Sequence, residues 1–455
     1  MAVEVTVGID IGTTSVKALA VDGDGRIVSR GRIAHELLAS HAGELAHPAD
    51  AAWHDGVLAA LAQLQSGSTA DVGPGVELDI RAVNVAAMVP SLCAVDEAGR
   101  PISPGLLYGD ARGASGQKET GPSSGEMVRF LAWLVRAYPN AAGYWPAQAV
   151  ANAALSGIGA IDTTVAYTTL PLFDFHGWDA EVAAGAGLDD ISRLPRIVSG
   201  SDPVGTVATA GGARLGGGTI DALGEQLVAG ADRDGDVLVI LGATLIVWAV
   251  IPDWREVDGL WTVPHTVPGM VLIGGPSNAG GLFVNWVARV LGIDPWAGSP
   301  MTDDPARVPV WQPYLRGERV PFHDPDRRAS LHDLDIGLGA DAVMRAAYEA
   351  SAFAVRHMLD LAGLQPSRIV ATGGGVRDGA WVQALADGTG LPVDVVAVPE
   401  GGALGAAWMA RQTAGLEQPG ADAGRWARTD RRVEPDSRWL AAVAGRYARY
   451  RELAG

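Results

Sequence analysis

The sequence predicts an α/β protein of two domains, each opening on a strand, a glycine turn and a second strand. Residues 5–21 (VTVGIDIGTTSVKALAV) and 237–251 (VLVILGATLIVWAVI) both follow this plan. Copies about half a chain apart indicate a duplicated domain with facing halves. A chain of 455 residues also exceeds one core. Charged and glycine residues cluster at 230–236, which divides the chain into domains 1–232 and 233–455.

Composition narrows the class of protein. The formal net charge of -18 disfavours nucleic acid or an anionic membrane as a partner, because both are bound through Lys and Arg. The single cysteine, Cys93, permits no internal disulfide and fits a reducing cytosol. A strand begins almost at once, which leaves no room for a signal peptide. We expect a cytoplasmic protein without nucleic-acid or membrane partners, and a homodimer is compatible with the sequence.

The turn of the first copy carries groups that suit a polyphosphate. Asp10 ends the first strand, where a carboxylate can hold a magnesium ion directly or through water. Gly12 lets the backbone approach a ligand closely. The neighbouring donors and positive charge come from Thr13, Thr14, Ser15 and Lys17. An ordinary tight turn is the alternative reading of this segment taken alone.

The second copy repeats the turn without its acid. Gly242, Ala243 and Thr244 stand where Gly12, Thr13 and Thr14 stand in the first copy, and Ile240 replaces Asp10. This run is continuously apolar, but at about 15 residues it is shorter than the ~20 that cross a bilayer. It is therefore predicted to be a hairpin and not a membrane span, and both hairpins would grip one nucleotide.

Between the two copies the pattern is less regular. Apolar residues at helical spacing predict a helix from Pro48, and residues 80–95 alternate like buried strands that break at Pro90. Residues 126–195 give no clear assignment. Glycine-rich and polar composition predicts loops at 113–125 and 200–207, and a glycine run at 211–219 leads to Asp221.

The second half alternates strands with helices, which favours a mainly parallel sheet covered by helices. Asp341 is expected to cap a long helix that runs to about Gly363. The elements expected after it are a strand at 369–371, a glycine turn at 373–375, a helix at 381–386, a strand at 393–398 and a small-residue helix from Gly401.

Three polar residues outside the hairpins are candidates for chemistry. Asp221 follows a glycine run and precedes a helical pattern, so its carboxylate can act as a general base or simply cap the helix. Both readings stay open on this observation alone. Asp110 and Arg112 follow an apolar strand and suit hydrogen bonds to sugar hydroxyls. A surface ion pair is the alternative for them.

Two common nucleotide motifs are absent from the sequence. No GxxxxGK[ST] occurs, so the chain is not a P-loop protein. The triple glycine at 373–375 follows a strand but lacks the GxGxxG spacing, which disfavours a hydride-transfer enzyme. Glycine amides at a helix entrance still suit a phosphate or an adenosine.

Taken together, the motifs resemble the FGGY family of carbohydrate kinases. The segments are, in order, IDIGTTSVK, LLYGDAR, GTIDALGEQLVAG, LGATLIVW, PYLRGERVP and ATGGGVRDGAWVQALADGTGLPV. The likeness extends to about Ala410. It implies two ribonuclease-H-like domains of the actin and Hsp70 type flanking a deep cleft. It also implies phosphorylation of a sugar, polyol or sugar acid with ATP and Mg²⁺.

The resemblance assigns roles position by position. Asp221 matches the catalytic base, which also contacts the substrate, and Asp10 matches the acid near magnesium. The segment PYLRGERVP, with Arg316, Glu318 and Arg319, is implied to order the cleft wall. The resemblance implies that the first phosphate loop, with its adjoining donors, comprises Gly12, Thr13, Thr14, Ser15 and Lys17, and that the second comprises Gly242 and Thr244. It implies that the nucleotide lies near Asn285, Gly374 and Gly375. It implies that the sugar lies near Met88, Asp110 and Arg112.

Departures from the family pattern leave the substrate open. Xylulokinase-like members carry GQMHG near the sugar, where this chain has AAMVPS at residues 86–91. This segment and GGPSNAGG at 274–281 are closer to gluconate kinases. The second loop usually reads GTS, so Ala243 lacks a hydroxyl. We expect a xylulokinase-like enzyme acting on a ketopentose or related polyol; the alternatives are a gluconate-type kinase and a non-catalytic ATP-binding protein.

Overall fold

The computed structural model describes residues 2–39, 43–67, 77–113, 126–265, 269–294 and 302–454, which fall into two compact units. The first unit contains residues of Met1–Gln117, Pro122–Val228 and Glu400–Trp426. Described residues of the second come from Ala229–Pro399 and Ala427–Gly455. The first unit thus also includes the segment Glu400–Trp426, which lies beyond the boundary expected after residue 232.

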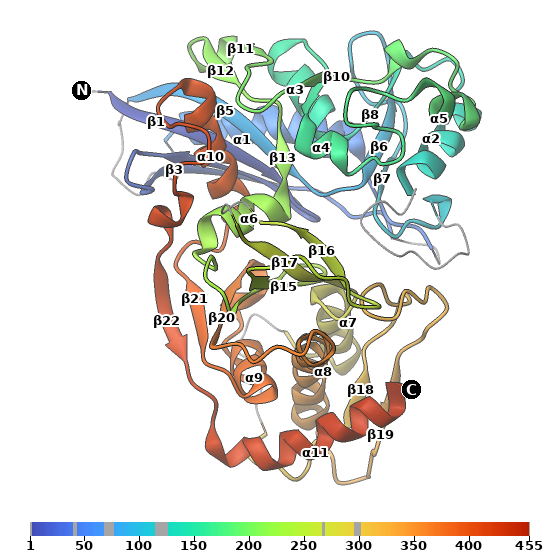
Figure 1. Cartoon of the computed structure of the whole chain (residues 1–455), viewed down its shortest axis with the longest axis vertical. Coiled ribbons are helices and arrows are strands. Elements are labelled where there is room, and N and C mark those ends of the chain that lie inside the picture. The colour runs from blue at the N-terminus through green and yellow to red at the C-terminus, as the bar shows by residue number, and fades with distance from the viewer. Residues whose placement is uncertain are drawn as a thin grey trace. The chain divides into compact units, whose positions relative to one another are not determined.

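The main sheet of the first unit has the strand order β11-β12-β5-β1-β2-β3, with β13 pairing beside β5 (Figure 1). Strands β1, β2 and β3 form an antiparallel meander, whereas β5 lies parallel to β1 and β12 lies parallel to β5. The bounds are β1 Val3–Ile11, β2 Ser15–Val21, β3 Ile27–Ala34, β5 Leu78–Ala87, β11 Gly205–Val207, β12 Ala213–Leu215 and β13 Thr219–Ile220.

Strand β1 divides its residues between two helix-covered faces, because successive side chains of a strand point to opposite sides. Odd-numbered residues such as Val7 and Ile9 join a core with α1 (Gly56–Gln65). On the other face, Gly8 lies against α10 (Gly401–Ala414), which crosses β1 and β5 in Figure 1. Asp10 is on this second face, at the end of the strand.

The rest of the first unit is built around smaller sheets. A sheet of order β4-β7-β6-β8 comprises β4 Ala46–His47, β7 Gly105–Leu107, β6 Ser91–Val95 and β8 Gly143–Trp145. Strands β9 (Ala160–Asp162) and β10 (Arg196–Val198) form a separate pair. The remaining helices are α2 Glu126–Ala137, α3 Ala147–Ser156, α4 Thr163–Tyr167, α5 Ala180–Gly185 and α6 Asp221–Ala229.

The second unit repeats the plan of the first. Its sheet has the order β16-β17-β15-β14-β20-β21-β22, in which β15 lies antiparallel to both β14 and β17, and β20 lies parallel to β14. The bounds are β14 Asp236–Leu241, β15 Leu245–Ile251, β16 Trp261–Pro264, β17 Val271–Ser277, β20 Arg368–Thr372, β21 Val393–Val396 and β22 Thr429–Val433.

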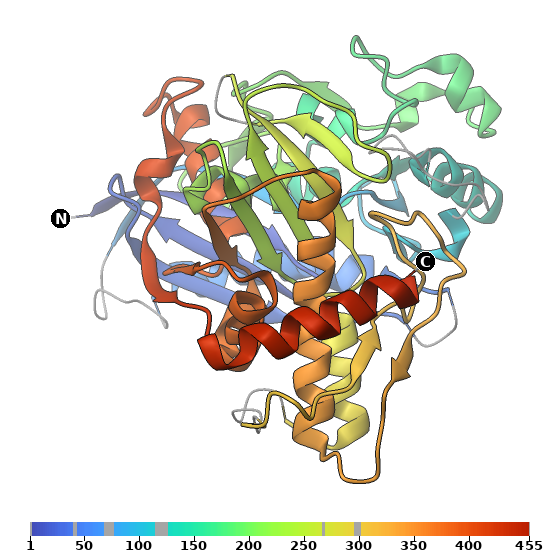
Figure 2. The same ribbon diagram turned by 60° about the horizontal axis from the view of Figure 1, so that its bottom comes forward.

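Helices cover the second sheet on the side of its main core. The longest of them, α8 (Ala340–Leu361), packs beside α7 (Gly281–Leu291) and α9 (Gly379–Thr389). Figure 2 shows α11 (Ser437–Ala454) crossing α8. Strands β18 (Val310–Gln312) and β19 (Ser330–His332) pair separately.

Several predicted elements are confirmed, and two predictions were wrong, one of them in part. The hairpins, the long helix and the strand at 393–396 are present. The cap was wrong: Asp341 lies within α8, whose N-cap is Gly339. Residues 200–207, predicted to be a loop, contain β11, and the glycine run at 211–219 contains β12 and the first residue of β13. The helix near Pro48 begins as a π-helix, Asp50–Asp55, ahead of α1. The loop expected at 113–125 lies almost wholly outside the described residues.

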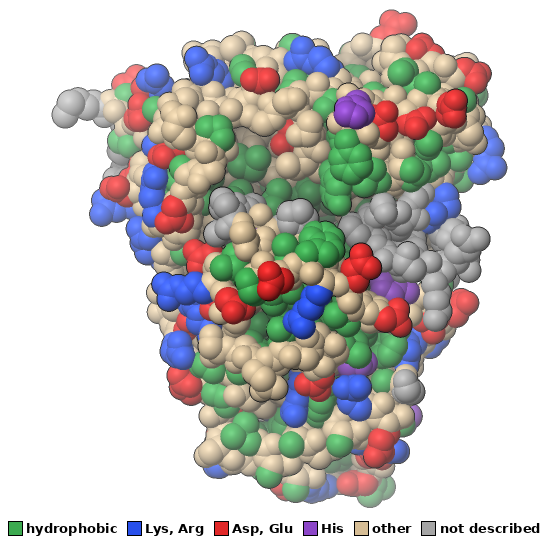
Figure 3. Space-filling view, in the orientation of Figure 1, with side chains coloured by type: hydrophobic (Ala, Val, Ile, Leu, Met, Phe, Trp, Pro, Cys, Tyr) green, Lys and Arg blue, Asp and Glu red, His purple; other side chains and the backbone are tan. Residues whose placement is uncertain are grey.

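On the face shown in Figure 3, basic side chains of the described residues are interspersed with acidic ones. Among the described residues, no helix combines the length and apolarity that a membrane crossing requires.

Candidate active site

Asp10 and Asp221 come to the same edge of the first sheet. In the β1–β5 ladder Asp10 pairs with Ala86, and in the β5–β13 ladder Ile220 pairs with Ala87. Asp221 follows directly and is the first residue of α6. Because β1, β5 and β13 run parallel, both acids lie where these strands end. Residues far apart in sequence thereby share one site.

Asp10 is buried and keeps one oxygen unpaired. Its side chain is 7% exposed, and Oδ2 accepts a hydrogen bond of 3.2 Å from Lys17 Nζ. The neighbouring charge of Asp10 raises the pKa of Lys17, so the ammonium stays charged. Asp10 Oδ1 has no hydrogen-bond partner among the described residues. A buried carboxylate oxygen in this state is costly unless a ligand or ion completes it.

The start of α10 lies against the Asp10 carboxylate. A Cβ atom on Gly402 would lie 3.1 Å from both Cγ and Oδ1 of Asp10. Glycine at position 8 permits this approach, because a Cβ there would lie 1.9 Å from the Ala403 carbonyl oxygen. The positive end of the helix dipole therefore faces the carboxylate and stabilises its charge.

Helices α6 and α10 also touch backbone to backbone. A Cβ on Gly405 would lie 2.1 Å from the Gly224 carbonyl oxygen, and one on Gly224 would lie 2.9 Å from the Gly402 carbonyl oxygen. Only residues without a side chain permit such contact. This packing sets the starts of both helices, with Asp221 on one and Glu400 at the head of the other, around Asp10.

Asp221 has an elevated pKa. Burial, followed by the negative charge of Asp10, raises it to about 6, while a hydrogen bond from the Ala222 amide and the charge of Lys17 act in the opposite direction. The Ala222 amide donates to Asp221 Oδ1 over 2.7 Å. A carboxylate with a pKa near neutrality, partly exposed at a strand end, is suited to exchange a proton. Glu225 and Glu400 add negative charge near Lys17.

The turn after β1 is closed by a hydrogen bond of 3.1 Å from the Gly12 amide to the Ser15 carbonyl. Ser15 is 3% exposed, whereas Thr13 is partly exposed and Thr14 is exposed. The solvent-facing part of this loop is thus Thr13 and Thr14. Asp10, Lys17 and this loop are neighbours within one hairpin, and Asp221 joins them from the same unit.

The three residues predicted near the sugar differ in what they offer. Met88 is 3% exposed and belongs to the core of the first unit, so its role toward a substrate stays a prediction. The oxygens of Asp110 accept four hydrogen bonds, three from Arg112 at 2.6–2.9 Å and one of 2.8 Å from the Leu45 amide. These fill the approximately four acceptor positions of a carboxylate. Arg112, whose side chain is 21% exposed, is the better placed of the pair to meet a ligand.

In the second unit, the glycine loops after β14 and β20 lie side by side. Ile240 pairs with Thr372, so Gly242 and Gly373 both follow at the same edge. A Cβ on Gly375 would lie 2.6 Å from Trp381, which makes this glycine a packing requirement. Gly374 is exposed, and a Cβ there would meet nothing within 4 Å.

In the loop after β14, the Gly242 amide donates a hydrogen bond of 3.1 Å to the Thr244 carbonyl, which closes the turn. Helix α7 begins against it, because the Gly281 amide donates to the Gly242 carbonyl over 2.8 Å. Asn285 is exposed one turn further along α7. These positions occupy one end of the second unit, as those of the first loop occupy one end of the first.

Glu318, from the segment PYLRGERVP, braces the same region of the second unit. It is 3% exposed and accepts hydrogen bonds from the Ser277 hydroxyl at 2.7 Å and the Asn278 amide at 2.8 Å. Burial raises its pKa to about 7, against the effect of these donors. Its contacts fix the end of β17 ahead of α7, which fits a structural role.

Comparisons with known proteins decide the family. Residues 5–121 match the N-terminal domain of the FGGY family of carbohydrate kinases, and residues 237–413 match its C-terminal domain. The chain belongs to the FGGY family. It is 31% identical to a xylulose kinase of Streptomyces coelicolor over 92% of this chain and 90% of the relative. It is 26% identical to a gluconokinase of Bacillus subtilis, over 84% of this chain and 82% of the relative.

Solved structures of the family have the same fold. A xylulose kinase from Rhodospirillum rubrum superposes with a TM-score of 0.74 and 25% identity, covering 98% of this chain and 97% of that one. The expected α/β class with two ribonuclease-H-like domains is thus confirmed. The FGGY chain is a carbohydrate kinase, and its class uses ATP as the phosphoryl donor.

The residues around Asp10 fit a divalent cation. Magnesium prefers oxygen ligands and is commonly held by one or two carboxylates together with water and phosphate oxygens. The buried unpaired Oδ1 of Asp10 offers such a ligand. Elsewhere in the described residues, Asp50, His54 and Asp55 also lie close enough together to hold an ion, but Arg100 pairs with both of these carboxylates.

Some residues of the site were missed by the sequence analysis. Gly8, Gly224 and Gly402 build the close packing around Asp10, and of these only Gly402 lies in the small-residue pattern that the sequence shows at the start of α10. His35, directly after β3, and His47, the last residue of β4, bond to the first loop from segments that carry no motif.

Proposed function

We propose that this FGGY kinase transfers the γ-phosphoryl group of ATP to a hydroxyl of a ketopentose of the xylulose type, with Asp221 as the general base. The observation that carries the proposal is the meeting of Asp221 and Asp10 beside the Gly12 turn. The similarity to xylulose kinases supports the substrate class.

The proposed base is suited to its task by its surroundings. With a pKa of about 6, Asp221 is mostly ionised at neutral pH and still basic enough to accept the proton that the attacking hydroxyl releases. The hydroxyl oxygen bonds to phosphorus as the bond from phosphorus to the leaving oxygen of ADP breaks. Lys17 lies near enough to Asp10 to offset negative charge that develops on the phosphoryl oxygens.

Phosphate binding is assigned to backbone amides of the two glycine turns. Thr13 and Thr14 belong to the first turn, and Ala243 and Thr244 belong to the second. Exposed Gly374 is assigned to the adenosine, with Asn285 near the nucleotide. Mg²⁺, held by Asp10 directly or through water, would neutralise charge on the phosphate oxygens when bound.

A sugar acid is the second candidate substrate, favoured by Arg112. Its guanidinium is fixed by Asp110 at 2.6 Å and 2.7 Å while its side chain remains partly exposed, which suits a carboxylate. The sequence AAMVPS and the gluconokinase relative point in the same direction.

The test is ADP release by the purified protein with a panel of ketopentoses, polyols and aldonates. Stimulation by a ketopentose above all others is the expected result. Selective stimulation by an aldonate, lost in Arg112→Gln, would assign the second candidate. ATP binding in calorimetry with a flat response across the panel would favour a non-catalytic protein. The homodimer, the cytoplasmic location and the absence of nucleic-acid and membrane partners stay predictions.

A further inference from the structure

Two histidines hold the carbonyl groups of the first glycine turn. His35 Nε2 lies 3.1 Å from the Gly12 carbonyl oxygen, and His47 Nε2 lies 2.9 Å from the Thr13 carbonyl oxygen. The two rings meet edge to face, with centroids 4.5 Å apart. All of these residues belong to the first unit.

Trp53 fixes which nitrogen of His47 carries the proton. The Trp53 Nε1–H group donates to His47 Nδ1 over 3.0 Å, so Nδ1 is the acceptor. A neutral imidazole has one N–H group, which must then be on Nε2 and point to Thr13. His47 is fully buried, and desolvation followed by the charge of His35 lowers its pKa to about 3, so the ring stays neutral.

A fixed carbonyl also fixes the next amide. In a planar trans peptide the C=O and N–H bonds point in opposite directions. Holding the Gly12 and Thr13 carbonyls inward therefore turns the amides of Thr13 and Thr14 outward. Among the described residues, neither amide donates a hydrogen bond to another protein group.

The second unit holds the same two carbonyl positions with different donors. There the Gly281 amide donates to the Gly242 carbonyl over 2.8 Å, and the Leu282 amide donates to the Ala243 carbonyl over 2.9 Å. The start of a helix thus does in one unit what imidazole rings do in the other. Ala243 and Thr244 present their amides in the same way, which does not depend on the hydroxyl that Ala243 lacks.

We propose that His47, backed by Trp53, is a positioning residue that orients the Thr14 amide toward the phosphates of ATP. His35 acts on the Thr13 amide through the Gly12 carbonyl only in the tautomer with its proton on Nε2, because Nδ1 lies 3.2 Å from a second acceptor, the Glu36 carbonyl oxygen. His47 itself does not touch the nucleotide. This inference rests on the proposed function, because the assignment of the turn to phosphate binding does.

Three substitutions of His47 separate its hydrogen bonds from its volume. His47→Gln keeps both bonds, because the amide oxygen and nitrogen of glutamine are separated by one carbon, like the two ring nitrogens. His47→Asn is polar but too short to reach Thr13, and His47→Leu fills the space without either bond. We expect Leu and Asn to raise both the KM for ATP and the nucleotide dissociation constant about tenfold. In His47→Gln, the KM for ATP and the nucleotide dissociation constant are expected to stay within about threefold of the wild-type values. In all three variants kcat should change less than the KM for ATP.

A matched control is His265→Leu. His265 is also buried, and its Nε2 bonds to a backbone carbonyl, that of Ala231 at 3.1 Å, away from the glycine turns. This change is expected to lower the unfolding temperature without altering the KM for ATP. Hydrogen exchange at residues 12–15 should be faster in His47→Leu than in wild type and unchanged in His265→Leu.

Unchanged ATP affinity in His47→Leu or His47→Asn, in protein that is folded by circular dichroism, would overturn the role of His47. Failure of Gln to restore affinity would do the same. Wild-type protein is measured in parallel. If it binds no ATP, or releases no ADP with any carbohydrate, the proposed function fails. If it is active while the variants bind ATP equally well, only the inference about His47 fails.

Discussion

Burial and the neighbouring negative charge of Asp10 together raise the pKa of Asp221 to about 6, while Lys17 lowers it. The two acids come from distant segments of the first unit and meet because parallel strands end at one edge. The charge of Asp10 thus makes Asp221 more basic, and Lys17, which pairs with Asp10, limits this effect. The acid and base properties of the site therefore depend on a triad of charges.

The rate of phosphoryl transfer should depend on pH through Asp221. A protonated carboxyl group cannot accept the proton of the substrate hydroxyl, so kcat/KM is expected to rise with pH through about 6 and level off above it. Direct measurement of ADP from about pH 5 to about pH 8 tests this. ATP also titrates in this range, which makes a control necessary.

Lys17→Gln provides that control. Because the positive charge of Lys17 lowers the pKa of Asp221, its removal should move the acidic limb of kcat/KM to higher pH. Titration of ATP would not move the limb. A limb at the same pH in both proteins, or none in either, would argue against Asp221 as the titrating base.

Asp221→Asn distinguishes a base from a helix cap. Asparagine caps helices about as well as aspartate, so a purely structural residue would tolerate the change. An amide cannot accept the proton, and we expect kcat to fall by about 10²- to 10⁴-fold with nucleotide affinity kept within about threefold. Steady-state rates and calorimetry measure these quantities. Near-normal kcat would assign Asp221 to capping.

The duplicated fold could be predicted from the sequence because its signal is local. At Gly12 and again at Gly242, one contiguous segment contains a strand, a glycine turn and a second strand. The order of the neighbouring strands is similar in the two sheets. The roles predicted for Asp10 and Asp221 were also reachable from motifs, although their proximity depends on strand pairing through β5.

The membership of α10 in the first unit could not be predicted in this way. It depends on the fit between Gly8 and Ala403 and between Gly224 and Gly405, which are contacts between remote parts of the chain. The sequence showed a small-residue helix but not its partner. His47 was missed for a similar reason, because a lone histidine beside Pro48 gives no sign that its ring reaches Thr13.

Gly8→Ala should disrupt both stability and the site. The added Cβ would lie 1.9 Å from the Ala403 carbonyl oxygen and 2.4 Å from the Ala407 amide nitrogen, so α10 must move away from β1. We expect the free energy of unfolding to fall by about 3 kcal/mol or more. We also expect kcat to fall, because the start of α10 lies against Asp10.

The control is Gly445→Ala, on the exposed side of α11, where a Cβ meets nothing within 4 Å. This change should stabilise the helix by about 0.5–1 kcal/mol. Calorimetric unfolding of both variants and their turnover check the contrast. Equal stability of Gly8→Ala and wild type would contradict the close packing of α10 on β1.

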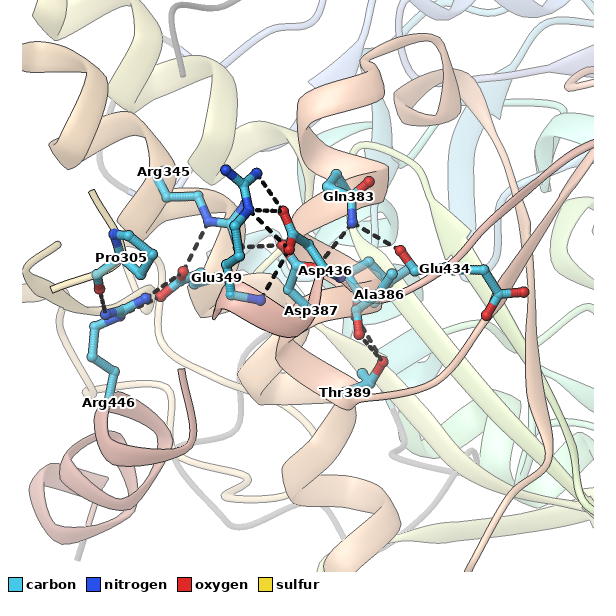
Figure 4. A network of polar contacts seen from close by, with 12 residues as sticks. Pro305, Arg345, Glu349, Gln383, Ala386, Asp387, Thr389, Glu434, Asp436 and Arg446 are labelled. Carbon is cyan, nitrogen blue, oxygen red and sulfur yellow. Dashed lines mark hydrogen bonds and ion pairs between the residues drawn. The ribbon is translucent and has the colours of Figure 1, made fainter. Parts of the chain in front are cut away.

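A buried charge network in the second unit gives the last prediction (Figure 4). Arg345 is 0% exposed and bonds to Glu349 at 2.8 Å and Asp387 at 2.7 Å. Arg446 bonds to the other side of Glu349 at 2.6 Å. These ion pairs link α8, α9 and α11. Arg345→Met leaves buried Asp387 without its arginine and Glu349 with Arg446 alone, so we expect it to lower the free energy of unfolding by about 3–5 kcal/mol.

Arg438→Met is the matched control. Its side chain is 73% exposed, and it pairs with Asp436 at 2.6 Å in solvent. Exposed pairs contribute about 0–1 kcal/mol, so this variant should unfold almost as wild type does. Differential scanning calorimetry compares the two. The network would add nothing to the stability of the second unit if Arg345→Met lowered the free energy of unfolding no more than Arg438→Met does. A buried carboxylate would then lose its arginine without any cost in stability.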